Sequence, residues 1–151
     1  MHHDQVKERL LESPDLAGLD DLSTAELVWR AEVQTFQHGE VIYAEGCSLD
    51  HTFCLLLSGD VLVESGGDIT CGLVEGQVFG EMAYFTNQRV RTATIRVGSE
   101  IAEVLRFRLT PAELHTEGLS ALRRFLFMRT WNRFVSTSQH ACTMEEASIC
   151  D

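Results

Sequence analysis

Two short segments carry residue types that together can hold a phosphate. Gly80 and Glu81 follow an apolar run, at a point where a strand gives way to a short helix. The first turn of a helix leaves backbone N–H groups unpaired, which makes it an anion site, and glycine lets a ligand approach the backbone closely. Eleven residues after Gly80, Arg91 offers a planar fork of donors for two phosphate oxygens, and Thr92 adds a hydroxyl beside it. Because the Glu81 carboxylate can accept a hydrogen bond from a ribose hydroxyl, the pattern predicts a site for a sugar phosphate.

The charge and the histidine spacing limit how such a site can work. The chain of 151 residues has a formal net charge of −11, and a surface this acidic repels nucleic acid. We therefore expect a local pocket and no nucleic-acid partner. A metal-dependent jelly-roll enzyme needs His-x-His and a nearby Glu on facing strands, but His38 and His51 are 13 residues apart and fall in turn regions. We therefore expect no metal site. The sequence also contains no recognisable arrangement of a nucleophile with a base, so we expect no catalysis.

The elements that must position these residues follow in the order helix, strands, helix. Residues 4–12 form a short amphipathic stretch, and Ser23 with Glu26 predicts a capped helix that ends near residue 31. From 32 to 107, short apolar runs alternate with glycine-bearing turns, which is typical of an all-β barrel or roll. The pair Gly66-Gly67 marks the clearest tight hairpin. The expected strands are Val41–Ala44, Thr52–Leu57, Val61–Val63, Ile69–Val74, Thr92–Val97 and Ile101–Leu105.

A long helical region is predicted after the strands, over 108–141. Thr110 and Glu113 form a second capping box, with Pro111 at the first helical position, and a break is expected near Gly118. The apolar residues from 119 to 135 cover more than the stripe of about 100° that docks one face of a helix on a sheet. The excess predicts either a helix that also covers a ligand or a second subunit, or an unusually well-buried helix.

The cysteines and apolar runs indicate the compartment. Five cysteines, at positions 47, 54, 71, 142 and 150, include no C-x-x-C pair. These features favour reduced thiols in a cytoplasmic protein over the alternative, an oxidised framework, with Cys54 and Cys71 as small core residues. The apolar runs are far shorter than the ~20 residues that span a bilayer. No signal-peptide pattern opens the chain, so no secretion is expected.

Several motifs together resemble the cyclic-nucleotide-binding domain family, which includes the sensor half of catabolite activator protein-type regulators. They are F-x-x-G-E-V-I from Phe36 to Ile42, E-G at 45–46, L-x-S-G-D-V from Leu56 to Val61, F-G-E-M-A from Phe79 to Ala83, and R-T-A-T from Arg91 to Thr94. The resemblance covers roughly residues 15 to 138. It implies a mainly β fold with flanking α-helices, namely an eight-stranded β-roll (jelly roll) with N-terminal helices and a long C-terminal helix. We divide this single domain into an N-terminal helical segment (1–31), the roll with its phosphate cassette (32–107), C-terminal helices (108–141) and a tail (142–151).

Carried over residue by residue, the resemblance also implies roles in the site. Gly80, Met82 and Ala83 would offer backbone N–H groups, Glu81 would bind the ribose 2′-hydroxyl, and Arg91 with Thr92 would hold the cyclic phosphate. Thr137 and Ser138 resemble a Thr-Ser pair that meets the adenine in the activator family. The expected ligand-binding set is Phe79, Gly80, Glu81, Met82, Ala83, Arg91, Thr92, Thr137 and Ser138.

The sequence departs from the family pattern in three places. The tail after Ser138 is too short for a DNA-binding helix-turn-helix, and Val90 stands where many relatives place proline. Tyr84 and Phe85 are bulkier than the leucine often found there, and we expect them to narrow the site.

The expected function is that of a regulatory sensor. It would bind cAMP or cGMP without a cofactor and reposition its C-terminal helix to control a partner or a fused domain, with a homodimer along that helix. The alternative is a degenerate roll that acts only as an interaction or dimerisation module and binds no nucleotide.

Overall fold

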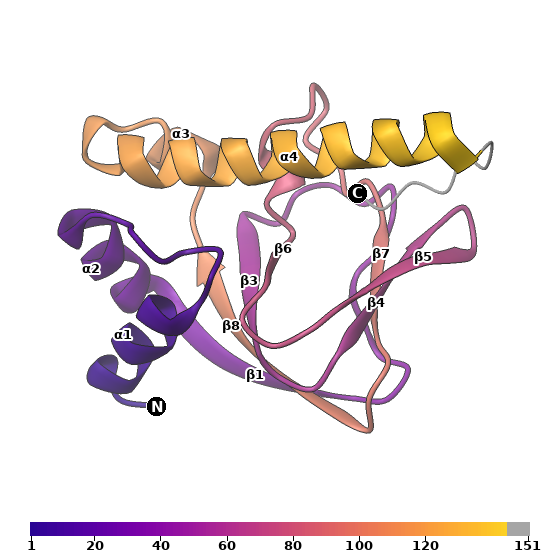
Figure 1. The fold of residues 1–151 in the computed structure, drawn as a ribbon. Helices are drawn as coiled ribbons and strands as arrows, with labels where there is room; N and C mark the ends of the chain where they lie inside the picture. The colour runs from indigo at the N-terminus through magenta and orange to yellow at the C-terminus, as the bar shows by residue number, and fades with distance from the viewer. Residues whose placement is uncertain (145–151) are drawn as a thin grey trace.

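Two four-stranded antiparallel sheets form a β-roll at the centre of the fold (Figure 1). The computed structural model describes the backbone of residues 1–144 and the side chains of residues 1–132. One sheet has the strand order β1-β8-β3-β6 and the other β2-β7-β4-β5. The strands are β1 (Ala31–Gln37), β2 (Val41–Tyr43), β3 (Thr52–Ser58), β4 (Val61–Ser65), β5 (Asp68–Leu73), β6 (Val78–Phe79), β7 (Thr94–Val97) and β8 (Ile101–Arg108). The expected eight-stranded roll is confirmed.

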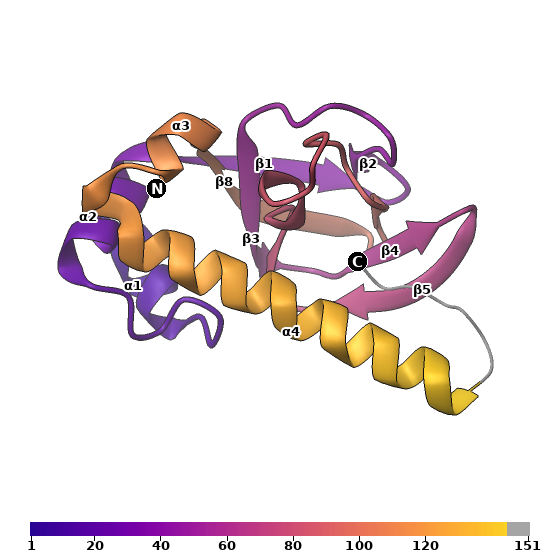
Figure 2. The same cartoon turned by 90° about the horizontal axis from the view of Figure 1, so that it is seen from above.

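Helices precede and follow the roll in the sequence. α1 (His3–Glu12) and α2 (Asp21–Arg30) precede it, whereas α3 (Pro111–Leu114), the 3-10 turn η2 (Glu117–Leu119) and α4 (Ser120–Met144) follow it. Figures 1 and 2 show α4 crossing the whole roll, from the side of α1 and α2 to the level of the tip of the β4–β5 hairpin. In the part of the chain that is described, no helix combines the length and apolar character needed to cross a membrane.

The core consists of two layers that share strand β3. Phe53, Leu55 and Leu57 face the helices, whereas Cys54 and Leu56 face the opposite sheet. This alternation follows from the two-residue period of a strand. Because β3 is buried on both faces, it reads in the sequence as an uninterrupted apolar run.

The predicted hairpin and one of the two predicted helix caps are confirmed. The hairpin at Gly66-Gly67 is present, with φ values of +60° and +89°. The Thr110 capping box also forms, since its hydroxyl accepts from Glu113 N at 3.1 Å. The expected Ser23 cap is wrong, because α2 begins at Asp21 with Asp20 as its N-cap, and the Asp20 carboxylate accepts from Ser23 N at 3.1 Å.

The cysteines on the described strands and loops differ in state. Cys54 is a free, fully buried thiol in the inner layer, and Cys47 is free and exposed. Cys71 on β5 is half-buried and disulfide-bonded. The expectation of reduced thiols is therefore wrong for Cys71.

Candidate functional site

The cassette between β6 and β7 depends on a glycine in an unusual conformation. Gly80 follows β6 directly with a φ of +87°, a region that side chains disfavour. A Cβ at this position would lie 2.6 Å from Tyr43 Cε2 and 3.1 Å from Arg91 Nη1. The expected helix after it is a single 3-10 turn, η1 (Met82–Tyr84). So short a turn carries little of the dipole of a full helix, so it attracts an anion less strongly than the start of a longer helix would.

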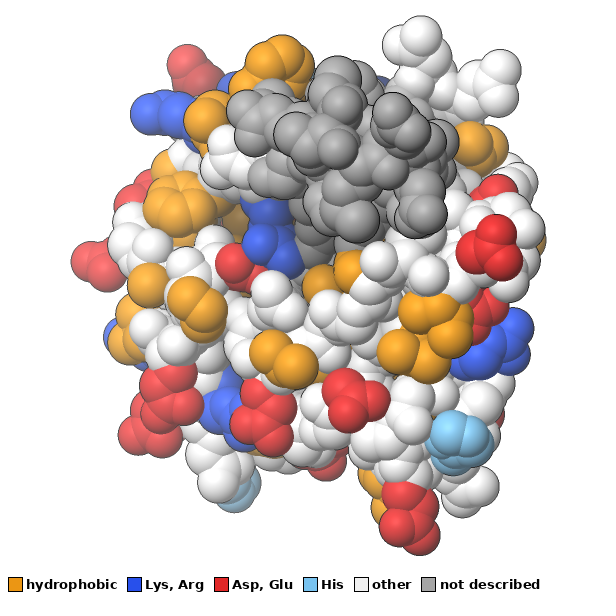
Figure 3. All heavy atoms as spheres, turned by 45° about the vertical axis from the view of Figure 1, so that its right-hand side comes forward, with side chains coloured by type: hydrophobic (Ala, Val, Ile, Leu, Met, Phe, Trp, Pro, Cys, Tyr) orange, Lys and Arg blue, Asp and Glu red, His pale blue; other side chains and the backbone are white. Residues whose placement is uncertain are grey.

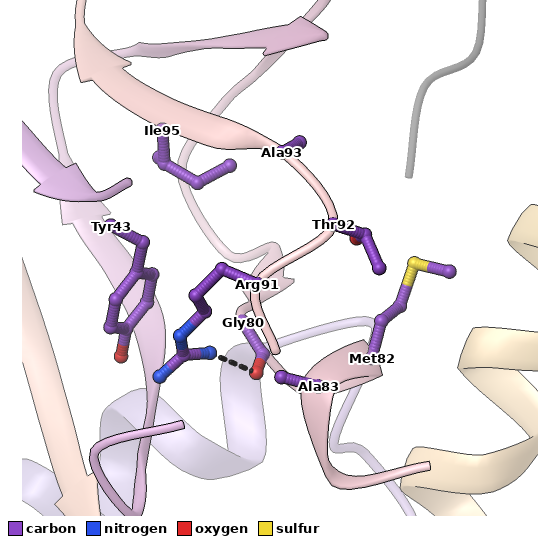
Figure 4. Close-up of a pocket in the computed structure, with 8 residues that line it drawn as sticks. All are labelled: Tyr43, Gly80, Met82, Ala83, Arg91, Thr92, Ala93 and Ile95. Carbon is purple, nitrogen blue, oxygen red and sulfur yellow. Dashed lines mark hydrogen bonds between the residues drawn. The ribbon is translucent and has the colours of Figure 1, made fainter. Parts of the chain in front are cut away.

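Arg91 is the buried centre of this site, with 4% of its side chain exposed. Its Nη1 donates to the Gly80 carbonyl at 2.7 Å, as Figure 4 shows. Its Nη2 donates to Asp50 Oδ1 and to the Thr52 carbonyl, both at 2.8 Å. The guanidinium carbon also lies 3.6 Å from the centroid of the Tyr43 ring. The buried charge is thus paired and hydrogen-bonded, which a buried arginine requires.

These bonds restrict how Arg91 can hold an anion. A guanidinium has five N–H donors. In Arg91, three of these donors already form hydrogen bonds within the protein. Both hydrogens of Nη2 are used. The guanidinium has two edges that offer a pair of N–H donors, Nη1 with Nη2 and Nε with Nη2, and both edges include Nη2. A phosphate gripped through two oxygens must therefore replace either Asp50 or the Thr52 carbonyl at Nη2.

Asp50 is held as a carboxylate in this cluster. Burial alone would raise its pKa, but the hydrogen bond from the Thr52 hydroxyl and the charge of Arg91 outweigh burial, and the pKa lies below its usual range. The carboxylate therefore stays charged at neutral pH and pairs with the guanidinium.

A small pocket opens beside Arg91, between the cassette and β7. It has a volume of about 20 Å³, which is room for about one water molecule. In Figure 4, Arg91 points towards Tyr43 and Gly80, whereas Met82 and Thr92 point away from Tyr43. The lining residues are Tyr43, Gly80, Met82, Ala83, Arg91, Thr92, Ala93 and Ile95.

Five residues of the expected site meet at this pocket, namely Gly80, Met82, Ala83, Arg91 and Thr92. Two others, Phe79 and Glu81, are fully buried outside its lining. The Phe79 ring packs edge-on against Tyr43, with centroids 6.0 Å apart. Thr137 and Ser138 lie outside the described side chains.

Glu81 lies next to an arginine of the C-terminal helix. Its Oε1 is 3.8 Å from Arg129 Nε on α4. Arg129 also donates to the Val78 carbonyl through Nε at 3.1 Å and Nη2 at 2.9 Å, and its Nη1 lies 2.8 Å from Asp15 Oδ1. Asp15 in turn accepts from Val78 N at 2.8 Å. One side chain therefore joins α4, the strand before the cassette and the loop between α1 and α2.

The departures from the family pattern have structural explanations. Val90 donates its N–H to Thr86 Oγ1 at 3.2 Å, a bond that proline cannot form. The Tyr84 hydroxyl donates to the Leu109 carbonyl at 2.6 Å, on the helix side of the sheet. The Phe85 ring packs edge-on against a phenylalanine of α4. The expectation that Tyr84 and Phe85 narrow the site is wrong, because neither lines the pocket.

Sequence reasoning missed Tyr43, Asp50 and Thr52, which surround the guanidinium. A buried arginine needs a carboxylate, but this requirement did not single out Asp50 among the acidic residues. Asp50 is 41 residues from Arg91 in the sequence, and only the fold brings the two together. Tyr43 lay inside the expected strand Val41–Ala44 and carried no separate signal.

Charges of both signs alternate on one face of the molecule. Basic side chains stand singly among acidic ones on the face in Figure 3. Within the described ranges, no group of His, Cys, Asp and Glu is arranged to hold a metal ion.

Comparison with known proteins places this geometry in a family. The family model described as the cyclic nucleotide-binding domain matches residues 33–111, just over half of the 151 residues. Among curated protein sequences, none matches the chain. The chain is similar in fold to cAMP-bound PfPKA-R, with a TM-score of 0.72, 20% identity and coverage of 87% of this chain and 44% of that one.

Two further solved structures share the fold. A putative cyclic nucleotide-binding protein from Geobacter metallireducens GS-15 has a TM-score of 0.70 and 24% identity, with 86% of this chain and 96% of that chain covered. The regulatory subunit of a cAMP-independent protein kinase A from Trypanosoma cruzi, bound to guanosine, has a TM-score of 0.65 and 16% identity, with 81% and 42% covered. The chain thus spans less than half of the two kinase regulatory structures. With the family match over the roll and the cassette geometry in place, the chain belongs to the cyclic nucleotide-binding domain family.

Proposed function

We propose that this domain is a regulatory module that binds a cyclic nucleotide, cAMP or cGMP, in the pocket beside Arg91. The observation that carries the proposal is that the Arg91 guanidinium and the Gly80 backbone meet at one pocket. The amides of Met82 and Ala83 and the hydroxyl of Thr92 would complete the phosphate site from the same lining. The two kinase regulatory structures with bound cAMP and guanosine support a nucleotide or nucleoside ligand.

The ribose end of the ligand offers a route to the C-terminal helix. Glu81 is the proposed acceptor for the 2′-hydroxyl, and its carboxylate lies 3.8 Å from Arg129 of α4. A hydroxyl that binds the Glu81 carboxylate would change the electrostatic attraction between Glu81 and Arg129. Arg129 also donates to the Val78 carbonyl and pairs with Asp15. Ligand binding would then shift α4 between two positions, which requires that one position binds the ligand better. A coupling of ~1–3 kcal/mol is typical of such switches.

A second candidate function is an interaction module without a nucleotide. It is favoured by the pocket volume of about 20 Å³ and by the internal hydrogen bonds of Arg91. The two functions differ in one measurable property, the affinity for nucleotides.

The test is calorimetric titration with cAMP, cGMP, a cyclic dinucleotide and guanosine. A sensor should bind one of them with a Kd well below ~1 mM. Arg91→Leu should weaken binding at least about 30-fold, because the phosphate loses a buried charged partner. Arg91→Lys keeps the charge but loses the planar fork, so it should also weaken binding.

The control is Arg96→Leu, because Arg96 lies on β7, the strand that follows Arg91, but does not line the pocket. Arg96 pairs with Glu64 at 2.9 Å and is 40% exposed. This variant should bind as the parent does. If Arg91→Leu kept the parental affinity, the phosphate site would be misassigned, and if the parent bound none of the ligands, the interaction module would be the better function.

We also propose that a second copy of the chain binds along α4. On the described part of this helix, Phe127, Met128 and Trp131 are 47%, 47% and 51% exposed. Such an exposed apolar surface is typical of interaction sites. Light scattering should give a dimer, and Met128→Glu should shift it towards the monomer. A parent that stays monomeric with and without ligand would refute this arrangement.

A further inference from the structure

A line of hydrogen bonds runs through the buried polar cluster behind Arg91. The Thr52 hydroxyl donates to Asp50 Oδ1 at 2.6 Å. The same hydroxyl oxygen lies 2.8 Å from the Tyr43 hydroxyl, which lies 3.2 Å from Cys54 Sγ. The Tyr43, Thr52 and Cys54 side chains belong to residues that are buried. The line therefore connects the inner core to the carboxylate at the site.

The chemistry of the four groups fixes the direction of each bond. A carboxylate only accepts, and the single hydrogen of the Thr52 hydroxyl is used on Asp50. Tyr43 must therefore donate to Thr52, and the Cys54 thiol must donate to Tyr43. Burial raises the pKa of both Tyr43 and Cys54, so each keeps its proton at neutral pH.

The line ends on the atom that orients the guanidinium. Asp50 Oδ1 accepts from both the Thr52 hydroxyl and Arg91 Nη2. Asp50 lies in a loop with 52% of its side chain exposed, so its position depends on such bonds. Tyr43 acts at a second point, since its ring lies under the Arg91 guanidinium and against Gly80.

We propose that Tyr43 and Thr52 are positioning residues of the anion site, which fix the Asp50 carboxylate and, through it, Arg91. The part of this inference that concerns ligand affinity rests on the proposed function. Besides Tyr43 and Cys54 in the line itself, the charged and titratable groups that act on Asp50 or its partners include Arg91, Arg106 of β8 and Tyr84 of η1. The Arg106 guanidinium carbon lies 5.6 Å from the centroid of the Tyr43 ring.

The first test needs no ligand. Carboxyl NMR titration of the folded protein measures the pKa of Asp50 in the parent and in Thr52→Val, Thr52→Ser and Tyr43→Phe. Thr52→Val removes the donor to the carboxylate, so the pKa should rise, and Thr52→Ser should restore the parental value. Tyr43→Phe keeps the ring but removes one link, so the rise should be smaller. Thr70→Val is the control, because its hydroxyl donates to the Val63 carbonyl at 3.1 Å, outside the cluster.

The second test measures affinity for the cyclic nucleotide that the parent binds. Thr52→Val should weaken binding by about tenfold, the equivalent of one lost hydrogen bond to a charged group, while Thr70→Val should leave it unchanged. Thermal melts establish that each variant is folded, and Tyr43→Phe serves if Thr52→Val is not. A parental Asp50 pKa in both folded variants would overturn the inference. If the parent binds no nucleotide, the proposed function fails, but the NMR titration still decides whether the line fixes Asp50.

Discussion

Replacing Gly80 with alanine would test how tightly the cassette is packed. The residue has a φ of +87°, a conformation that costs an L residue roughly 1–2 kcal/mol. The added Cβ would lie 2.6 Å from Tyr43 Cε2 and 3.1 Å from Arg91 Nη1, so one of these groups must move. Overpacking of this kind costs a further ~1–3 kcal/mol. Gly80→Ala should therefore lower the free energy of unfolding by about 2–5 kcal/mol.

A second glycine provides a matched control for the backbone part of this cost. Gly39 has a φ of +83°, and a Cβ there would meet nothing within 4 Å. Gly39→Ala should therefore cost only the roughly 1–2 kcal/mol of backbone strain. The difference between the two variants isolates the contact of position 80 with Tyr43 and Arg91.

Urea denaturation followed by far-UV circular dichroism gives the free energy of unfolding for the parent and both variants. Titration of the same proteins with cAMP adds the effect on the site, where Gly80→Ala should weaken binding and Gly39→Ala should not. Equal unfolding free energies for the two variants would mean that Tyr43 and Arg91 move aside without cost. The inference that the site is rigidly packed would then be refuted.

Three further predictions concern other bonds. Arg129→Met should lower the free energy of unfolding by about 1–3 kcal/mol, because the half-buried Asp15 loses its half-buried partner. The substitution of the exposed Arg124, Arg124→Met, should not lower it, and urea denaturation compares the two. Thr110→Ala removes the cap of α3 and should cost about 1 kcal/mol in the same assay. Although burial alone would raise it, hydrogen-bonding and charged partners hold the pKa of Asp50 below its usual range. The Asp50 carboxylate therefore stabilises the fold at pH values above its pKa in the unfolded chain, about 4, and this stabilisation is lost as the pH falls through its pKa in the folded protein. In a pH series, the free energy of unfolding of Asp50→Asn should fall less steeply towards acid pH than that of the parent.

The roll was predictable because its turns need glycine and its inner strands are apolar. β1 (Ala31–Gln37) was missed because it lacks those signals: it alternates half-buried with exposed residues, most of them polar, along much of its length. For β6 (Val78–Phe79), which has only two residues, the sequence indicated only that a strand ends before Gly80. Both are defined by pairing, β1 with β8 and β6 with β3. Pairing partners far apart in the sequence leave no local pattern.

The candidate site likewise contains residues that the sequence could indicate and residues that it could not. Gly80 and Arg91 could be identified because the cassette is a continuous motif with a fixed spacing. Asp50 could not, since the chain has 23 acidic residues and any of them could have met a buried arginine. Glu81 was assigned from the motif alone, and only the structure reveals that Arg129 of α4 lies beside it.

The bonds of Arg91 also indicate how a ligand would enter. A phosphate oxygen that replaces the neutral Thr52 carbonyl at Nη2 gains a stronger, charge-assisted bond, whereas one that replaces the Asp50 carboxylate exchanges one anion for another. We therefore expect the exchange at the carbonyl, with Asp50 remaining on the guanidinium and orienting it. On this basis Asp50→Ala should weaken cAMP binding, even though it removes a negative charge near the phosphate. Tighter binding by Asp50→Ala in calorimetry would instead mean that the ligand displaces Asp50, and that the carboxylate competes with the phosphate.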